Sequence, residues 1–103
     1  GKALPLYEEC LRISKIVLED HPDLFSYMNN LGNLYYDQRE YSKALPLYEE
    51  SLSKSIVVLG ENHPETLYYM YNLANLYIKL GEYEKALPLY DHYVKMRKVG
   101  SGK

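Results

Sequence analysis

The sequence predicts an all-α fold, a solenoid of about 2.5 repeats in which helical hairpins stack on one another. Two observations support this: an internal repeat with a period of 41 or 42 residues, and apolar residues at three- and four-residue spacing inside each unit. With 103 residues, 47% of them apolar and 25% charged, the chain suits one globular domain rather than a disordered segment. We therefore expect a single domain of five helices.

Three separate blocks carry the period. The segment Lys2–Glu9 returns unchanged as Lys43–Glu50, and its first six residues return again as Lys85–Tyr90. Two shorter blocks recur with few changes at 42 residues: 30–35 with 72–77, and 21–23 with 63–65. This period predicts a domain over 1–99, divided into a half-repeat 1–18, a repeat 22–59 and a repeat 64–99, with a flexible tail at 100–103.

The half-repeat 1–18 carries the block of a second helix, so we expect one helix there, without its own first helix. The first helix of the complete repeat is predicted from Pro22 to about Gln38, because the apolar residues follow one stripe. His21, Pro22 and Asp23 form its start signal, since a first-turn proline gives up no useful N–H and a carboxylate complements the helix dipole.

The second helix is predicted from Tyr41 to about Leu59, with the same periodicity. Gly60 supplies a residue able to end it in the left-handed conformation. Pro46 lies about one turn inside, where it costs less than the roughly 3 kcal/mol of a mid-helix proline. The repeat 64–99 contains the same two helices, including the proline at its start.

Two positions depart from the repeat. Arg39 stands where the next unit has Gly81, so a non-glycine must take the left-handed turn at a cost on the order of 1 kcal/mol. Tyr93 replaces the small residue found at Cys10 and Ser51, where successive helices approach. We therefore expect the last helix to lack a close neighbour at this point or to be shifted.

The repeated unit resembles the tetratricopeptide repeat in its long, 42-residue form, and most closely the repeats of kinesin light chains. The resemblance rests on the light-chain-like blocks at 43–48 and 59–64 and on small and tyrosine residues at the motif positions: Leu31, Gly32, Tyr35, Tyr41, Ala44, Tyr48, Leu73, Ala74, Tyr77, Gly81, Tyr83, Ala86 and Tyr90. It implies a right-handed superhelix whose first helices line a concave groove that binds a protein or peptide partner.

By the same resemblance, the groove positions are mostly asparagines and tyrosines: Ser26, Asn29, Asn30, Asn33, Asp37, Tyr68, Tyr71, Asn72, Asn75 and Lys79. An asparagine amide can pair with a peptide backbone without reading its sequence, and tyrosine adds contact area at low entropy cost. Lys79 is the only basic residue among them, which disfavours a carboxylate clamp. For Asn30 and Asn72, hydrogen bonding between neighbouring helices is an equally good interpretation.

Composition and spacing argue against other classes of function. A net charge of −2 provides no basic field for nucleic acid or anionic membranes. His21 and His63 lie one repeat apart and suit helix capping better than metal binding, while Cys10 lies on a small-residue stripe typical of packing. We expect no enzyme, no metal, no cofactor, and a cytoplasmic location.

The two ends of the predicted array lack polar caps, which solenoids need for solubility. We expect apolar or aromatic residues on these end faces, at Leu6, Leu11, Ile13 and Tyr93. Two alternatives to groove binding follow: a structural module that self-associates end to end, or a piece of a larger signalling or transport adaptor repeat protein. A homo-oligomer formed through the uncapped ends is therefore a further expectation.

Overall fold

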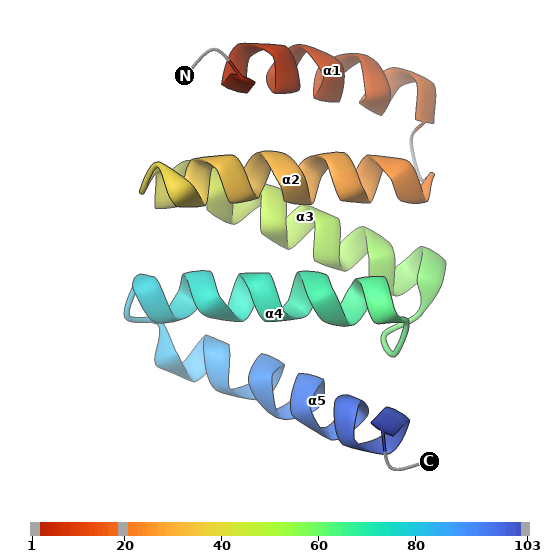
Figure 1. Cartoon of the computed structure of the whole chain (residues 1–103), viewed down its shortest axis with the longest axis vertical. Helices are drawn as coiled ribbons and strands as arrows, with labels where there is room; N and C mark the ends of the chain where they lie inside the picture. Colours follow the sequence, from red (N-terminus) through yellow and green to blue (C-terminus); the bar gives the residue numbers. More distant parts are fainter. Residues whose placement is uncertain (1–2, 19–20, 102–103) are drawn as a thin grey trace.

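The computed structural model describes the backbone of residues 3–18 and 21–101, and the side chains of 5–6, 8–13 and 21–97. This part of the chain forms five helices: α1 (Ala3–Leu18), α2 (Pro22–Asp37), α3 (Tyr41–Leu59), α4 (Pro64–Lys79) and α5 (Tyr83–Ser101). They follow one another down the long axis of the molecule (Figure 1), and the all-α prediction is confirmed.

The predicted boundaries agree closely with the helices, except at the C-terminal end. Helix α5 continues to Ser101, two residues into the segment expected to be a tail, so that boundary is wrong. A glycine at position 100 is tolerated inside the helix at a cost of about 1 kcal/mol. Residues 102–103, and residues 1–2 of the half-repeat, lie outside the described part of the chain.

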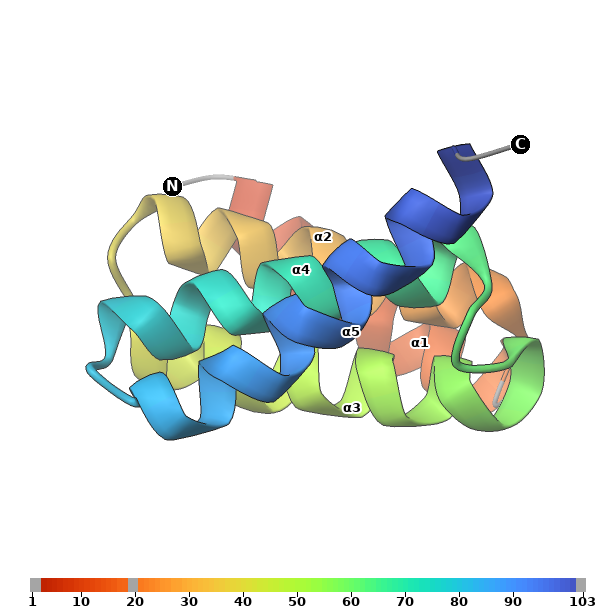
Figure 2. The same cartoon turned by 90° about the horizontal axis from the view of Figure 1, so that it is seen from below.

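The helices form two layers. Helices α2 and α4 lie side by side in one layer, and α3 lies in the other, below them in Figure 2 and behind them in Figure 1. Each helix packs on the next along the chain, which is the arrangement of stacked hairpins. The positions predicted to line a groove therefore fall on two neighbouring helices of the same layer.

The starts of α2 and α4 are built in the same way. His21 Nδ1 accepts a hydrogen bond from the backbone N–H of Asp23, and His63 Nδ1 accepts one from Glu65, each at 3.1 Å. A proline follows each histidine at the first helical position, where no N–H is needed. Both histidines therefore act as helix caps.

The ends of α2 and α4 form matching turns. In the first, the N–H of Glu40 donates to the carbonyl of Tyr35 at 2.8 Å and the N–H of Arg39 to that of Tyr36 at 2.9 Å, a Schellman motif. The second turn repeats these bonds around Gly81. Arg39 has a φ of 63° and Gly81 a φ of 78°, so the arginine does take the left-handed conformation.

Tyrosine hydroxyls connect each repeat to the preceding second helix. The hydroxyl of Tyr35 donates to the carboxylate of Glu8, and that of Tyr77 donates to Glu49 at 2.7 Å. Burial, reinforced by this carboxylate, raises the pKa of Tyr77 to about 12. The phenol therefore remains a hydrogen-bond donor at physiological pH.

Close packing of α3 on α2 depends on small residues. A Cβ added at Gly32 would lie 2.7 Å from Cε1 of the buried Tyr48 ring, so glycine allows this ring to approach the helix. Ser51 is fully buried, and its hydroxyl donates to the carbonyl of Phe25 at 3.0 Å. The two helices therefore approach at both places where the sequence provides a small side chain.

The contact of α5 with α4 is different because its residues are larger. Tyr93, at the position of Ser51, lies with its ring 5.0 Å from that of Tyr71 on α4, and Arg97 lies 5.4 Å above the Tyr93 ring. Helix α5 crosses α4 at an angle, and its C-terminal half runs toward the layer of α4 (Figure 2). Tyr93 therefore has a close neighbour on α4, and the alternative that the last helix lacks one at this point is wrong.

Candidate functional site: the groove between α2 and α4

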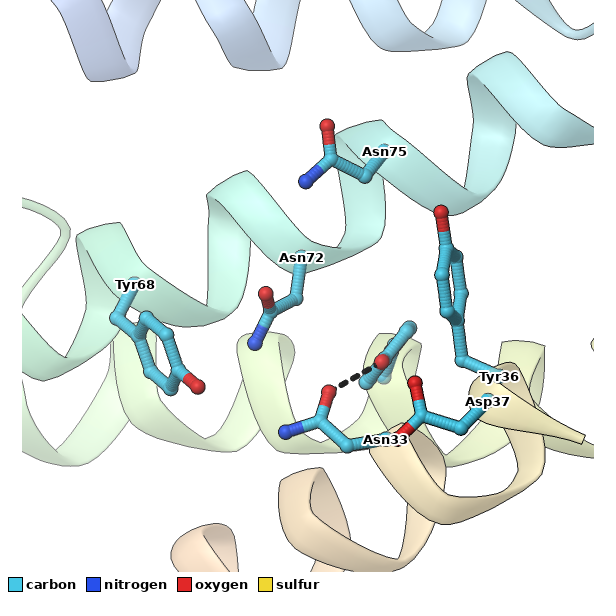
Figure 3. A pocket seen from close by; sticks show the side chains of 7 residues that line it. Asn33, Tyr36, Asp37, Tyr68, Asn72 and Asn75 are labelled. Atoms are coloured by element: carbon cyan, nitrogen blue, oxygen red, sulfur yellow. Dashed lines mark hydrogen bonds between the residues drawn. The ribbon is translucent and has the colours of Figure 1, made fainter.

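A hollow of about 350 Å³ lies between α2 and α4 and reaches the second layer at Tyr48. Figure 3 shows it from close by, with amide, phenol and carboxylate groups gathered around the opening. It is lined by Asn33, Tyr36, Asp37, Tyr48, Tyr68, Asn72 and Asn75. Five of these residues, Asn33, Asp37, Tyr68, Asn72 and Asn75, belong to the predicted groove.

Tyrosine hydroxyls from the second layer hold two of the asparagines. Tyr48 donates to Oδ1 of Asn33, and Tyr90 donates to Oδ1 of Asn75 in the next repeat. Burial raises the pKa of both phenols above the ordinary value, so they keep the proton that they donate. Because each carbonyl oxygen is occupied, the NH₂ group of each amide is left to bind a ligand acceptor.

Asn72 joins the two helices that line the groove. Its Nδ2 donates to Oδ1 of Asn29 at 3.3 Å, which supports the structural interpretation of this residue. Asn72 also lines the hollow, and its side chain lies at the opening in Figure 3. Asn72 therefore holds α4 to α2 through its amide nitrogen, while its Oδ1 is an acceptor that a ligand can use.

Asn29 does not face the groove. Its side chain is only 1% exposed, because it turns between the helices to meet Asn72, and the prediction that it contacts a ligand is wrong. The Nδ2 of Asn29 has no hydrogen-bond partner within the described part of the chain. Asn30 is exposed but does not line the hollow, and Ser26 shares a hydrogen bond of 3.2 Å with the Tyr69 hydroxyl.

The groove tyrosines differ in how free they are. Tyr68 is 50% exposed and lines the hollow, so its ring is available to a partner. Tyr71 is 38% exposed, but its ring packs against Tyr90 at 6.0 Å and Tyr93 at 5.0 Å. Tyr71 therefore supports α5, and Tyr68 is the better candidate for direct contact.

A second hollow, of about 440 Å³, adjoins the first at the C-terminal ends of α2 and α4. It is lined by Tyr36, Asp37, Arg39, Tyr41 and Lys79, and it shares Tyr36 and Asp37 with the first hollow. Lys79 is the one basic residue among the predicted groove positions, and Arg39, from the turn after α2, adds a second cation in this hollow.

Sequence reasoning missed Tyr36, Tyr41 and Arg39 as groove residues. Tyr36 and Tyr41 meet edge to face with ring centroids 5.4 Å apart, and both line the second hollow. Arg39 is visible in the sequence as a departure from glycine, but the side on which its side chain lies depends on the turn. In the structure, the positive φ of Arg39 marks this turn as the one in which an arginine replaces the glycine of the next repeat.

The end-face residues separate into exposed and buried ones. Leu6 and Ile13 are exposed on α1, as predicted, whereas Leu11 is only 9% exposed and belongs to the core, so its assignment to the free face is wrong. Leu11 lies on the side of α1 that packs on α2. Tyr93 is half-buried against Tyr71.

Cys10 is exposed, contrary to the packing role expected for it. Its counterpart Ser51 is buried because α2 precedes α3 and covers that face, and no helix of the described residues covers this face of α1. Within the described ranges, no helix is long and apolar enough to cross a membrane. The same residues contain no group of three or more His, Cys, Asp or Glu able to hold a metal.

Comparison with known proteins agrees with this architecture. Two models of the tetratricopeptide repeat match, one over residues 2–23 and 24–65 and the other over 46–98. No curated protein matches the sequence.

Similar solved structures are light-chain repeats. The nearly identical TPR-like repeats of a putative kinesin light chain from Podosopora anserina superpose with a TM-score of 0.87 at 24% identity, over 93% of this chain and 46% of that one. A single-substitution variant of the same protein gives a TM-score of 0.88 with the same identity and coverage.

BtubC (BKLC) from P. vanneervenii superposes with a TM-score of 0.86 at 26% identity, over 94% of this chain and 39% of that one. This chain thus spans less than half the length of the structures that it matches. The resemblance to light-chain repeats is confirmed, and the chain belongs to the tetratricopeptide-repeat family, whose repeats are protein–protein interaction modules.

Proposed function

We propose that this chain binds an extended segment of a partner protein in the groove between α2 and α4, without catalysis. The observation that carries the proposal is the hollow itself, where two oriented amides, an exposed tyrosine ring and a carboxylate surround one opening. These are general contacts for a polypeptide and not the convergent titratable groups of a catalytic centre.

The amides match the backbone of a partner segment. Asn33 and Asn75 have their oxygens fixed by tyrosine hydroxyls, so each presents N–H donors to a peptide carbonyl. Asn72 Oδ1 and the Asp37 carboxylate are acceptors for peptide N–H groups. Because the donors come from two helices and two repeats, a segment lying along the groove could use them together.

Tyr68 adds the apolar part of the contact. A half-exposed tyrosine ring buries a large area with little loss of side-chain freedom, which is the property that enriches tyrosine in binding sites. Tyr68→Ala should therefore weaken binding about 10-fold, equivalent to about 1.4 kcal/mol. Tyr27→Ala is a matched control, because Tyr27 is an exposed tyrosine outside the hollow.

The test is selection from a random twelve-residue peptide library displayed on phage, followed by calorimetric titration of the enriched peptides. We expect binders at or below about 100 μM that lose affinity with Tyr68→Ala and keep it with Tyr27→Ala. The absence of enriched peptides, or equal affinity for the Tyr68→Ala variant, would refute the proposal.

A second candidate function is self-association through the end faces. Leu87 and Val94 on α5 are exposed, whereas their counterparts on α3, Leu45 and Leu52, are half-buried and buried in the core, respectively. A second copy would cover this apolar surface. Sedimentation equilibrium tests it: a monomer at every concentration up to about 1 mM would exclude it, and loss of a dimer on Leu87→Glu would support it.

A further inference from the structure

The turn between α2 and α3 contains an arginine in a conformation that glycine adopts more easily. Arg39 has a φ of 63°, and the matching turn of the next unit has the same hydrogen bonds around Gly81. An L-residue loses on the order of 1 kcal/mol in this region relative to its usual conformations. The two turns therefore differ mainly in the arginine side chain that the first one carries. Residues in strained backbone conformations are concentrated at functional sites.

That side chain lines the second hollow together with Lys79. Neither cation forms an ion pair within the described part of the chain, although the protein as a whole carries a net charge of −2. Arg39 and Lys79 therefore place positive charge at the end of the groove that the second hollow forms, whereas the lining of the first hollow contains a carboxylate and no cation.

Asp37 is the one carboxylate among the residues that line this hollow, and it lies at the border with the first one. Figure 3 shows its carboxylate directed toward Asn33 and the first opening. In that position it can accept from a donor of the partner segment, and the second hollow, with two cations and one carboxylate in its lining, keeps an excess of positive charge.

We propose that Arg39 and Lys79 bind an anionic side chain of the partner segment, either a carboxylate or a phosphate, at this end of the groove. The proposal rests on the groove function above and adds the chemistry of one partner position. A guanidinium can contact either anion with two parallel hydrogen bonds, while an ammonium contributes a point charge.

A purely structural role for the cations makes a different prediction. Both groups lie near the C-terminal ends of helices, where positive charge is favourable to the helix dipole. In that case Arg39→Gly would lower the melting temperature. We instead expect it to be unchanged or higher, because glycine removes the strain at φ 63°.

The experiment uses the same phage library on the wild type and on Arg39→Gly. We expect Asp or Glu at one position of the peptides selected by the wild type, and loss of this preference with the variant. A selected peptide should bind the variant about 5-fold more weakly, the size expected for a solvent-exposed charge pair, while its Glu→Gln version binds both proteins equally.

The matched control is Gly81→Arg, which places an arginine in the other turn. It should lower the melting temperature and leave the affinity for the acidic peptide unchanged. A phosphoserine version of the peptide distinguishes the anions: tighter binding than the glutamate version assigns the site to phosphate, and weaker binding assigns it to a carboxylate.

Failure of this inference differs from failure of the groove function. Peptides that bind and depend on Tyr68, but show no acidic preference or no sensitivity to Arg39→Gly, overturn the anion site alone. If the library yields no binder, both proposals fall. A lower melting temperature for Arg39→Gly with unchanged affinity assigns the arginine to the helix end and also overturns the anion site.

Discussion

Removal of the Tyr77 hydroxyl should weaken the contact between the two repeats and make the protein less sensitive to alkali. Tyr77 is 8% exposed and donates to the Glu49 carboxylate at 2.7 Å. Its pKa is raised from 10.0 to about 12, so the folded state holds the phenolic proton more tightly than the unfolded chain. The stabilisation is therefore complete below pH 10 and is lost as the pH rises to about 12.

The size of the effect follows from these two values. At pH 11 the unfolded chain has released most of this proton and the folded protein has not, which costs about 1.4 kcal/mol of unfolding free energy, at about 1.36 kcal/mol per pH unit. At neutral pH, Tyr77→Phe should cost about 1 kcal/mol, because a single hydrogen bond is lost and the exposed Glu49 can bind water instead.

Urea unfolding followed by circular dichroism at pH 8 and pH 11 measures both quantities. Tyr77→Phe should lose about 1.4 kcal/mol less than the wild type between the two pH values, since other titrating groups contribute equally to both proteins. Glu49→Gln keeps a hydrogen-bond acceptor but removes the charge. Its loss of unfolding free energy between pH 8 and pH 11 should therefore lie between those of the wild type and Tyr77→Phe. An equal loss in the wild type and Tyr77→Phe would refute the assignment.

Three further substitutions test the packing. Gly32→Ala should destabilise the protein by up to about 2 kcal/mol, because displacing the Tyr48 ring costs about 1–3 kcal/mol and alanine returns about 1 kcal/mol of helix propensity; a more stable variant in urea unfolding would contradict this. His63→Ala should cost about 1 kcal/mol by the same measurement, as expected for a lost cap, and an unchanged midpoint would exclude the capping role. Tyr93→Ser should cost about 1 kcal/mol through its stacking on Tyr71, and unaltered thermal unfolding in calorimetry would contradict that contribution.

The sequence alone predicts the helices well because their limits are set by local chemistry. Proline starts α2 and α4 at residues 22 and 64, and Gly60 ends α3 with a φ of 99°. These signals act within a few residues, so the sequence alone is enough to identify them. The repeat then transfers each prediction from one unit to the next.

The groove is only partly predictable because periodicity does not specify which neighbour covers a side chain. Asn29 and Asn33 lie one turn apart on α2, yet one is buried against α4 and the other lines the hollow. Leu11 and Ile13 similarly differ only by the presence of α2 on one side of α1. Arg39 reaches the second hollow through the geometry of a turn, which a one-dimensional pattern does not contain.

The bond between Asn72 and Asn29 has a mechanical consequence. It is a direct side-chain link between the two groove helices, and the Asn29 amide nitrogen already lacks a partner within the described residues. A ligand that turned the Asn72 amide toward itself would leave both polar ends of Asn29 buried and unsatisfied, at a cost of about 1–3 kcal/mol for the oxygen that loses its hydrogen bond. Under the proposed function, binding at this point would therefore be coupled to the spacing of the two repeats, so a ligand that breaks this bond would also change how closely α2 and α4 pack.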